Sequence, residues 1–155
     1  MIYLGVDPGT TLIGYAFVEK NNGLHALEYN VIKTSGKSQA VKLEKIQKDL
    51  EKVIKKYRPV SAGVELLYFS KNQKTAIAVA EARGVILYTL QKMGVKIYEF
   101  SPNEIKSSIA GHGGGSKEDV RRALEMSFGK KLAKRPDDAI DALAIALRTA
   151  LEITN

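Results

Sequence analysis

Four acidic residues stand inside or beside apolar runs, and this placement constrains the fold more than any other feature of the sequence. Asp7 and Glu65 each directly follow a short apolar run, and Asp138 and Asp141 open a longer one, residues 138–147. An unpaired ionised carboxylate near a core costs several kcal/mol, so it usually has a compensating partner. Basic residues are scarce beside these acids, whereas a divalent cation would compensate all of them at once. The pattern therefore indicates metal-dependent chemistry.

Each of these acids also has a purely structural interpretation. Asp7 leads into a Pro-Gly turn and could hydrogen-bond the turn backbone. Glu65 could occupy a sheet edge and face solvent, although Glu has poor strand propensity. Asp138 and Asp141 share one face of a predicted helix, where like charges repel unless a helix N-terminus or a cation compensates them. Asp137 could replace one of them as a ligand, but we interpret it as the residue that caps the helix.

The chain as a whole is strongly basic, with 24 Lys and Arg against 17 Asp and Glu and a net charge of +7. A basic body around an acidic pocket suits a polyanionic substrate that is processed with a metal. The alternative is a lysine-rich solvated surface. The length of 155 residues predicts one domain, residues 1–155. Cysteine is absent from the sequence, which excludes disulfides and Cys-ligated zinc and suits a reducing cytosol.

We expect no targeting or membrane segment. The apolar N-terminal run ends at Asp7, and it lacks the basic residues that precede the apolar region of a signal peptide. No stretch approaches the roughly 20 apolar residues that a membrane-spanning helix needs. The sequence therefore predicts a cytoplasmic protein without membrane contact.

Periodicity and turn residues predict an alternating architecture. Strands are expected over residues 2–7, 14–20, 24–33, 61–66 and 95–100, and helices over residues 41–57, 74–93, from 102, 117–128 and 136–151. Three consecutive strands followed by helix–strand units predict an α/β fold with a mixed five-stranded sheet and helices on both faces.

Two loops carry residues that suit nucleic-acid contacts. The loop 111–117 resembles a phosphate cradle because its glycines allow close backbone approach, although it lacks the Walker pattern. Basic residues flank it: Lys106, Lys117, Arg121 and Arg122. A flexible surface loop is the alternative, and its lone His112 is not taken as a ligand. In the other loop, Tyr68 and Phe69 could stack on bases, with core packing as the alternative for one of them.

Together these motifs resemble the RuvC family of bacterial Holliday junction resolvases over almost the whole chain. The matching segments are Leu4–Thr10 with Gly14 and Tyr15, Val64–Glu65 with Ser70–Asn72, Ala82–Val85, Ile105–Lys106 with Gly111 and Lys117, and Asp138–Ala146. The first segment alone also occurs in sugar kinases and actin-like ATPases. The five segments in this order and at these spacings are distinctive.

The resemblance implies an RNase H-like fold, a homodimer, and cleavage of two opposed strands of a four-way DNA junction. It assigns Asp7, Glu65, Asp138 and Asp141 as ligands of two Mg²⁺ ions about 4 Å apart, for which Mn²⁺ would substitute. It also implies cooperation with the RuvA–RuvB branch-migration complex. Lys106 and Lys117 match the family's DNA-contacting lysines. The full set of DNA-binding residues that we expect is Tyr68, Phe69, Lys71, Asn72, Arg83, Lys106, Gly113, Lys117 and Arg121.

Two departures from the family pattern affect these expectations. Tyr68 stands where the family usually has a Phe that works at the junction centre, which leaves open whether Tyr68 or Phe69 has that role. The chain also lacks the basic tail of some family members. Residues 74–93 are the expected dimer helix because they are rich in small and apolar side chains; the alternative is that both of its faces are buried within one subunit.

Two competing functions remain at the level of sequence. A sugar kinase or actin-like ATPase needs two such domains around a nucleotide cleft, and the chain is short for that arrangement. A non-catalytic junction-binding module would have no reason to place four acids against DNA. We therefore expect a metal-dependent endonuclease.

Overall fold

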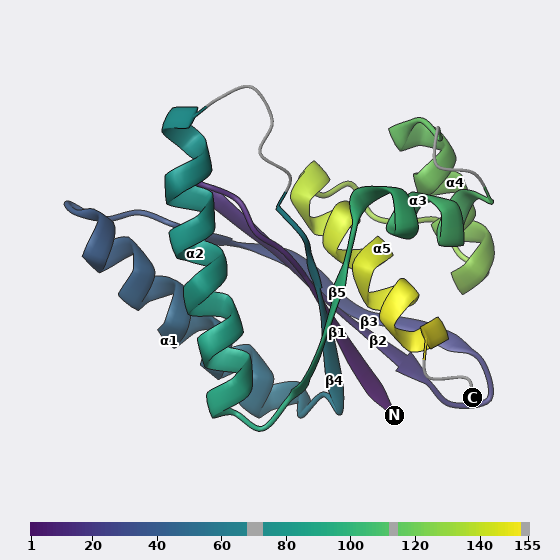
Figure 1. Ribbon diagram of the computed structural model, residues 1–155. Helices are drawn as coiled ribbons and strands as arrows, with labels where there is room; N and C mark the ends of the chain where they lie inside the picture. The colour runs from purple at the N-terminus through teal and green to yellow at the C-terminus, as the bar shows by residue number, and fades with distance from the viewer. Residues whose placement is uncertain (68–72, 112–114, 153–155) are drawn as a thin grey trace.

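A five-stranded mixed sheet forms the centre of the computed structural model, which describes residues 1–67, 73–111 and 115–152 (Figure 1). The strand order is β3-β2-β1-β4-β5, with β1 antiparallel to β2, β2 antiparallel to β3, and β4 parallel to both β1 and β5. The strands are β1 (Ile2–Asp7), β2 (Leu12–Lys20), β3 (Leu24–Lys33), β4 (Ser61–Glu65) and β5 (Lys96–Phe100). The predicted α/β class and mixed sheet are confirmed.

Helices cover both faces of this sheet (Figure 1). One face carries α1 (Gln39–Tyr57) and α2 (Gln73–Lys92). The other carries α3 (Pro102–Ala110), α4 (Lys117–Phe128) and α5 (Asp137–Glu152), and α5 lies directly on β1 and β2. Each face encloses its own hydrophobic cluster. The predicted order of elements is confirmed.

Small differences at the ends of elements have local causes. The helix expected from residue 41 begins at Gln39, because the Ser38 side chain accepts a hydrogen bond from the Val41 amide at 3.3 Å and caps it. The strand expected from residue 14 begins at Leu12, because Leu12 still pairs with Lys33 of the long strand β3.

Glycines on the sheet set how closely α5 approaches it. A methyl group added at Gly14 would overlap the main-chain carbonyl oxygen of Asp138, and one added at Gly5 would overlap that of Ala142. A methyl group added at Gly63 would overlap the Thr149 hydroxyl in the same way. Isolated glycines in strands mark such close backbone approaches, so they were the available signal in the sequence. They fix the height of the first turns of α5 above the ends of β1 and β2.

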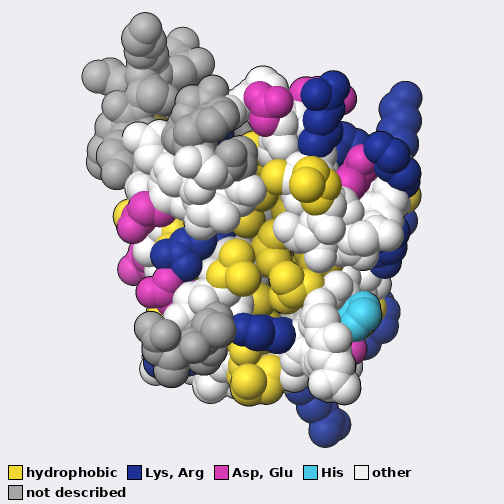
Figure 2. All heavy atoms as spheres, turned by 90° about the vertical axis from the view of Figure 1, so that its right-hand side faces the viewer, with side chains coloured by type: hydrophobic (Ala, Val, Ile, Leu, Met, Phe, Trp, Pro, Cys, Tyr) yellow, Lys and Arg dark blue, Asp and Glu magenta, His cyan; other side chains and the backbone are white. Residues whose placement is uncertain are grey.

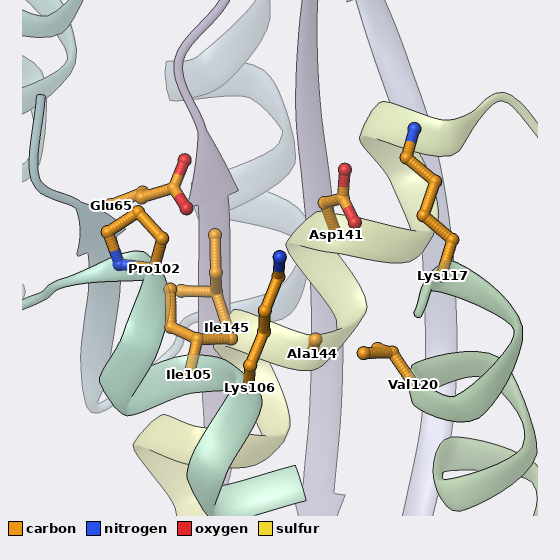
Figure 3. A pocket seen from close by; sticks show the side chains of 9 residues that line it. All are labelled: Glu65, Pro102, Ile105, Lys106, Lys117, Val120, Asp141, Ala144 and Ile145. Atoms are coloured by element: carbon orange, nitrogen blue, oxygen red, sulfur yellow. The ribbon is translucent and has the colours of Figure 1, made fainter. Parts of the chain in front are cut away.

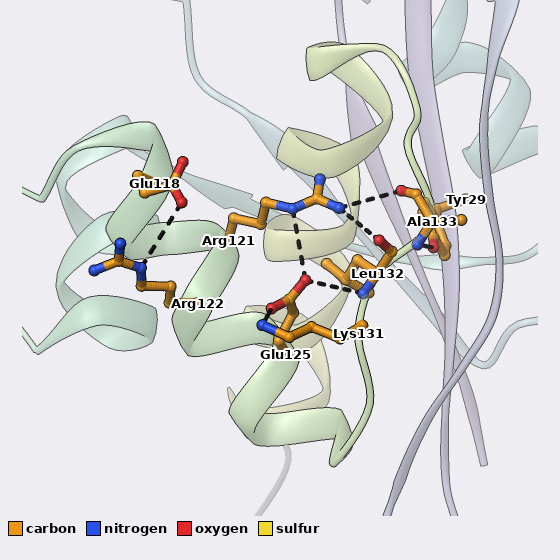
Figure 4. A network of polar contacts seen from close by, with 8 residues as sticks. All are labelled: Tyr29, Glu118, Arg121, Arg122, Glu125, Lys131, Leu132 and Ala133. Atoms are coloured by element: carbon orange, nitrogen blue, oxygen red, sulfur yellow. Dashed lines mark hydrogen bonds and ion pairs between the residues drawn. The ribbon is translucent and has the colours of Figure 1, made fainter.

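The segment between α4 and α5 is held by a network of polar contacts (Figure 4). The Arg121 guanidinium donates a hydrogen bond to the Leu132 carbonyl at 2.6 Å, and the Glu125 carboxylate accepts one from the Leu132 amide at 3.0 Å. The Tyr29 hydroxyl accepts a further bond from the Ala133 amide at 2.8 Å. The chain therefore enters α5 from a fixed direction.

Candidate active site

Two of the predicted ligands, Asp7 and Glu65, are the last residues of the adjacent parallel strands β1 and β4. Parallel strands end at the same edge of a sheet, so the two side chains leave it at one place. The two carboxyl groups lie close enough for each to affect the pKa of the other. Burial raises the pKa of Asp7 to about 8, and the negative charge of Glu65 adds to this rise. Burial also raises the pKa of Glu65.

The helix α5 brings the other two acids to the same place. Asp138 and Asp141 lie three residues apart near its start, and both are half-buried. The negative charges of both contribute to the raised pKa of Asp7. Burial raises the pKa of Asp141 too, although the positive charge of Lys117 opposes this. The structure thus brings all four acids together at one end of the sheet, while their role as ligands stays a prediction.

The chemistry of these acids fits a hard divalent cation. Burial first, and then the neighbouring negative charges, raise the pKa values of Asp7, Glu65 and Asp141, so ionised carboxylates here lack full compensation. Carboxylate oxygens are ligands that Mg²⁺ and Mn²⁺ prefer. Within the described part of the chain, no three His, Asp or Glu side chains stand close enough together to hold one ion. Side chains would therefore have to turn inward to close around a metal.

A cavity of about 230 Å³ lies between β4, α3, α4 and α5 and contains two of these acids (Figure 3). Glu65 and Asp141 point into it from the strand and from α5. Lys106 extends from α3 between the two carboxylates, and its positive charge partly opposes the burial that raises the pKa of both. Apolar side chains close the bottom: Pro102, Ile105, Val120, Ala144 and Ile145. The cavity therefore combines carboxylate oxygens with cations that suit a phosphate.

Lys117 begins α4 and lines the same cavity, but its ammonium group is bound to Asp137 at 2.6 Å. Asp137 is the first residue of α5, inside the helix rather than before it. The interpretation of Asp137 as the capping residue is therefore wrong, because its carboxylate points to a cation from another helix. Both side chains are largely exposed, so the pair is easily exchanged for another partner.

Two arginines that we expected to contact DNA have partners inside the protein. The Arg83 Nε donates to the main-chain carbonyl of Glu65 at 3.1 Å, and its guanidinium forms an ion pair with Glu99 of β5. Arg121 is bound to the α4–α5 segment as described above. Nothing in the sequence near either arginine indicates these partners, because they come from other elements.

The remaining predicted DNA-binding residues fall on segments that the structure does not describe. Tyr68, Phe69, Lys71, Asn72 and Gly113 all lie outside the described residues. The end of the predicted phosphate cradle, residues 115–117, is described.

At that end, Ser116 caps α4, and its side chain and that of Asp119 each accept a hydrogen bond from the other residue's main-chain amide. The cradle therefore leads into a helix N-terminus, which is a place that favours anions.

Comparison with known proteins identifies the family. A family model described as crossover junction endodeoxyribonuclease RuvC matches residues 3–149. The chain belongs to the RuvC family. Proteins of that name from Halothermothrix orenii and Petrotoga mobilis are 42% and 43% identical to it over 149 and 148 residues. The aligned parts cover 95% and 94% of this chain and 90% and 91% of the two relatives.

Solved RuvC structures share the fold over nearly the whole length. RuvC of Thermus thermophilus in complex with a Holliday junction substrate matches with a TM-score of 0.89 at 33% identity, covering 98% of this chain and 94% of that one. The yeast mitochondrial Holliday junction resolvase Ydc2 is 15% identical, with a TM-score of 0.68 over 94% of this chain and 76% of its own, and shares the fold. The RNase H-like fold expected for a RuvC protein is therefore confirmed.

No helix in the described ranges of this RuvC-family chain is long and apolar enough to cross a membrane.

Proposed function

We propose that this chain is a metal-dependent endonuclease that resolves four-way DNA junctions by paired, symmetric nicks. One observation carries the proposal: four acids from β1, β4 and α5 gather at one end of the sheet, beside a cavity that also holds Lys106 and Lys117. The names of its RuvC relatives agree with this activity. A rival role as a non-catalytic junction binder does not explain why the fold brings four carboxylates together.

Asp7, Glu65, Asp138 and Asp141 would hold two Mg²⁺ ions, with Mn²⁺ as a substitute. When bound, such ions activate a water molecule for in-line attack and stabilise the leaving 3′ oxygen. The protein's own part is to hold these carboxylates at the margin of the core. The apolar side chains of the core exclude bulk water from one side of the site. The products would carry a 5′-phosphate and a 3′-hydroxyl. The sequence has no Cys, which excludes a Cys-His nucleophile.

Lys106 and Lys117 have a different part in the reaction. Lys106 already interacts with Glu65 and Asp141, so its ammonium group would meet a phosphate bound at the metal side of the cavity. Lys117 would leave Asp137 for the same phosphate, because an exposed ion pair is worth about 1 kcal/mol or less. The two lysines would thereby orient the scissile strand against the acids.

The substrate class is supported by the charge of the molecule. On the side that carries α3, α4 and α5, an apolar area is bordered by Lys and Arg side chains with Asp and Glu among them (Figure 2). A net charge of +7 favours a polyanion such as DNA. Because the proposed substrate is DNA, we place the activity in the cytoplasm, carried out by residues 1–155 as one domain. The RuvA–RuvB complex is the partner that family membership suggests.

A homodimer would supply the two active sites that symmetric cleavage needs. The helix α2 supports this proposal. Ile77 and Tyr88 are 68% and 61% exposed, and Gly84 between them has open space around it. Ala82 and Ile86 of the same helix are buried against the sheet. One face of α2 is therefore used within the subunit, and the other offers an apolar stripe to a second copy.

The test is nicking of a synthetic four-way junction against a linear duplex of the same sequence, with and without Mg²⁺. We expect nicks in two opposed strands of the junction, no cleavage of the duplex, and no reaction after the metal is chelated. Junction binding without nicking, in Mg²⁺ and in Mn²⁺, would favour the non-catalytic module instead.

A further inference from the structure

Arg83 joins three elements around the end of the strand that carries Glu65. It lies in α2, and its side chain is only 16% exposed. Its Nε donates to the main-chain carbonyl of Glu65 at 3.1 Å, which is the end of β4. The same guanidinium forms an ion pair with Glu99 of β5. A largely buried arginine with these partners connects elements within the protein rather than standing free on the surface as a cation.

The Glu65 carbonyl needs this donor because the sheet does not supply one. The Leu66 amide donates to the Phe100 carbonyl at 2.8 Å, so the Glu65 carbonyl of the same trans peptide points away from β5, toward the β1 side. On that side β1 ends at Asp7 and continues into Pro8, which has no amide N–H to donate. A partly buried carbonyl without a donor is costly, and this peptide would be held only through the Leu66 amide. Arg83 therefore completes the hydrogen bonding of the residue whose side chain enters the site.

The chemistry of arginine suits both contacts at once. Its planar guanidinium presents donors on two edges, so one can meet the carbonyl while the other meets Glu99. Burial lowers the pKa of Arg83, which means that desolvation opposes its charge. Glu99 offsets this by supplying the opposite charge. Lysine has a single flexible ammonium group and cannot hold this geometry with both partners.

We propose that Arg83 is a positioning residue for the metal site, because it fixes the Glu65 main chain and hence the direction of the Glu65 carboxylate toward Asp7. The inference rests on the proposed function, since it concerns the same acids. Arg83 also connects two proposed sites: α2 carries the exposed stripe of Ile77, Gly84 and Tyr88, and β4 carries a catalytic acid. Its action on the reaction is indirect, through Glu65.

The experiment compares Arg83→Met with Glu99→Gln. Arg83→Met removes the bond to the Glu65 carbonyl and the ion pair, whereas Glu99→Gln removes only the charge of the ion pair. Mn²⁺ binding to the free protein is measured by calorimetry, together with the Mg²⁺ dependence of nicking, junction affinity in Ca²⁺, and the thermal midpoint. We expect Arg83→Met to weaken Mn²⁺ binding and raise the Mg²⁺ requirement by about tenfold, with unchanged junction affinity. Glu99→Gln should keep wild-type metal binding.

Two outcomes would overturn the inference. Equal loss of metal binding and thermal stability in both variants would mean that the ion pair merely anchors α2. Weaker junction binding by Arg83→Met, with a salt dependence lowered by about one unit and normal metal binding, would make Arg83 a DNA contact as the sequence suggested. If Arg83→Met does not fold, Arg83→Lys, which keeps the charge, takes its place; it should weaken Mn²⁺ binding, and wild-type binding would refute the inference.

The proposed function can fail separately from this inference. A wild-type protein that binds Mn²⁺ but nicks no junction would refute the nuclease, while a tenfold shift in Mn²⁺ binding on Arg83→Met would still support the positioning role. A wild type that nicks junctions, with Arg83→Met indistinguishable from it in Mn²⁺ binding, would refute only the positioning role.

Discussion

The two helical layers of this molecule meet the sheet in different ways. On one face, α5 rests directly on the backbone of Gly5 and Gly14, without side chains between. On the other face, α2 packs through ordinary side chains and leaves Ile77 and Tyr88 exposed. Backbone-to-backbone contact sets distances tightly, whereas side chains can adjust. The tightly set layer carries Asp138 and Asp141, and the adjustable layer offers an outward surface, so the proposed catalytic residues of α5 and the proposed dimer surface lie on opposite faces of the sheet.

Neutralising one of the four acids should produce the largest effect, because all four are proposed metal ligands. Asp141→Asn keeps the shape of the side chain but removes a ligand charge, and we expect loss of nicking with junction binding retained. The same applies to Asp7→Asn, Glu65→Gln and Asp138→Asn. Gel-based nicking and binding assays measure both quantities. Asp137→Asn is the matched control and should keep nicking; substantial Mg²⁺-dependent nicking by Asp141→Asn would remove Asp141 from the ligand set.

One substitution placed on each face compares the layers directly. Gly14→Ala should push the start of α5 off the sheet and lower the free energy of unfolding by about 1–3 kcal/mol, as overpacking does. Gly84→Ala, in the interior of α2 with open space around it, should raise that free energy by about 0.5–1 kcal/mol. Urea unfolding followed by circular dichroism measures both. If both substitutions change the free energy of unfolding in the same direction, the two layers do not differ in how they accommodate an added methyl group.

Charge on the α2 stripe should separate assembly from folding. Tyr88→Asp places a carboxylate on the exposed apolar stripe, so we expect a monomer at micromolar concentration with an unchanged fold. Sedimentation, alone and with junction DNA, reports the state. Val41→Asp is the control, since it also charges a partly exposed apolar side chain, but on α1. A wild type that is monomeric with and without junction, yet cuts both strands in concert, would contradict the dimer.

The acids should make the metal-free protein sensitive to pH. Because the folded pKa of Asp7 is raised from 3.8 to about 8, the folded state holds a proton that the unfolded chain releases. Stability without metal should therefore be highest below about pH 4 for this group and fall as pH rises to about 8. Asp7→Asn should reduce this fall, and Mg²⁺ should oppose it in the wild type. Thermal midpoints in a chelating buffer across this range would test the sign; a rise of stability with pH that Asp7→Asn abolishes would contradict it.

The lysines beside α5 should have the smallest effect. Lys106→Ala and Lys117→Ala should weaken binding to junctions of every sequence alike, and each should lower the slope of affinity against salt by about one unit. Lys48→Ala, an exposed lysine of α1 on the opposite face, is the control. A changed preference for the sequence at the cut would mean that the lysine reads bases.

The architecture was predictable because periodicity and turn residues act locally. The acids were predictable for the same reason, since each interrupts an apolar run. Interaction partners that come from distant elements could not be predicted in this way. Arg83 and Arg121 carry a charge that suits DNA, and only the fold reveals that main-chain carbonyls take up their donors. The pair of Lys117 and Asp137 joins two helices whose sequences give no sign of it.

The late position of α5 in the chain has a consequence for biosynthesis. The hairpin of β2 and β3 can form as soon as it leaves the ribosome, because its strands are joined by a short turn at Asn22 and Gly23. The pairing of β1 with β4 must wait for α1 to be made. Asp138 and Asp141 emerge after every strand, and only then is the β1–β2 face covered. A nascent chain that still lacks α5 therefore lacks two of the four proposed metal ligands.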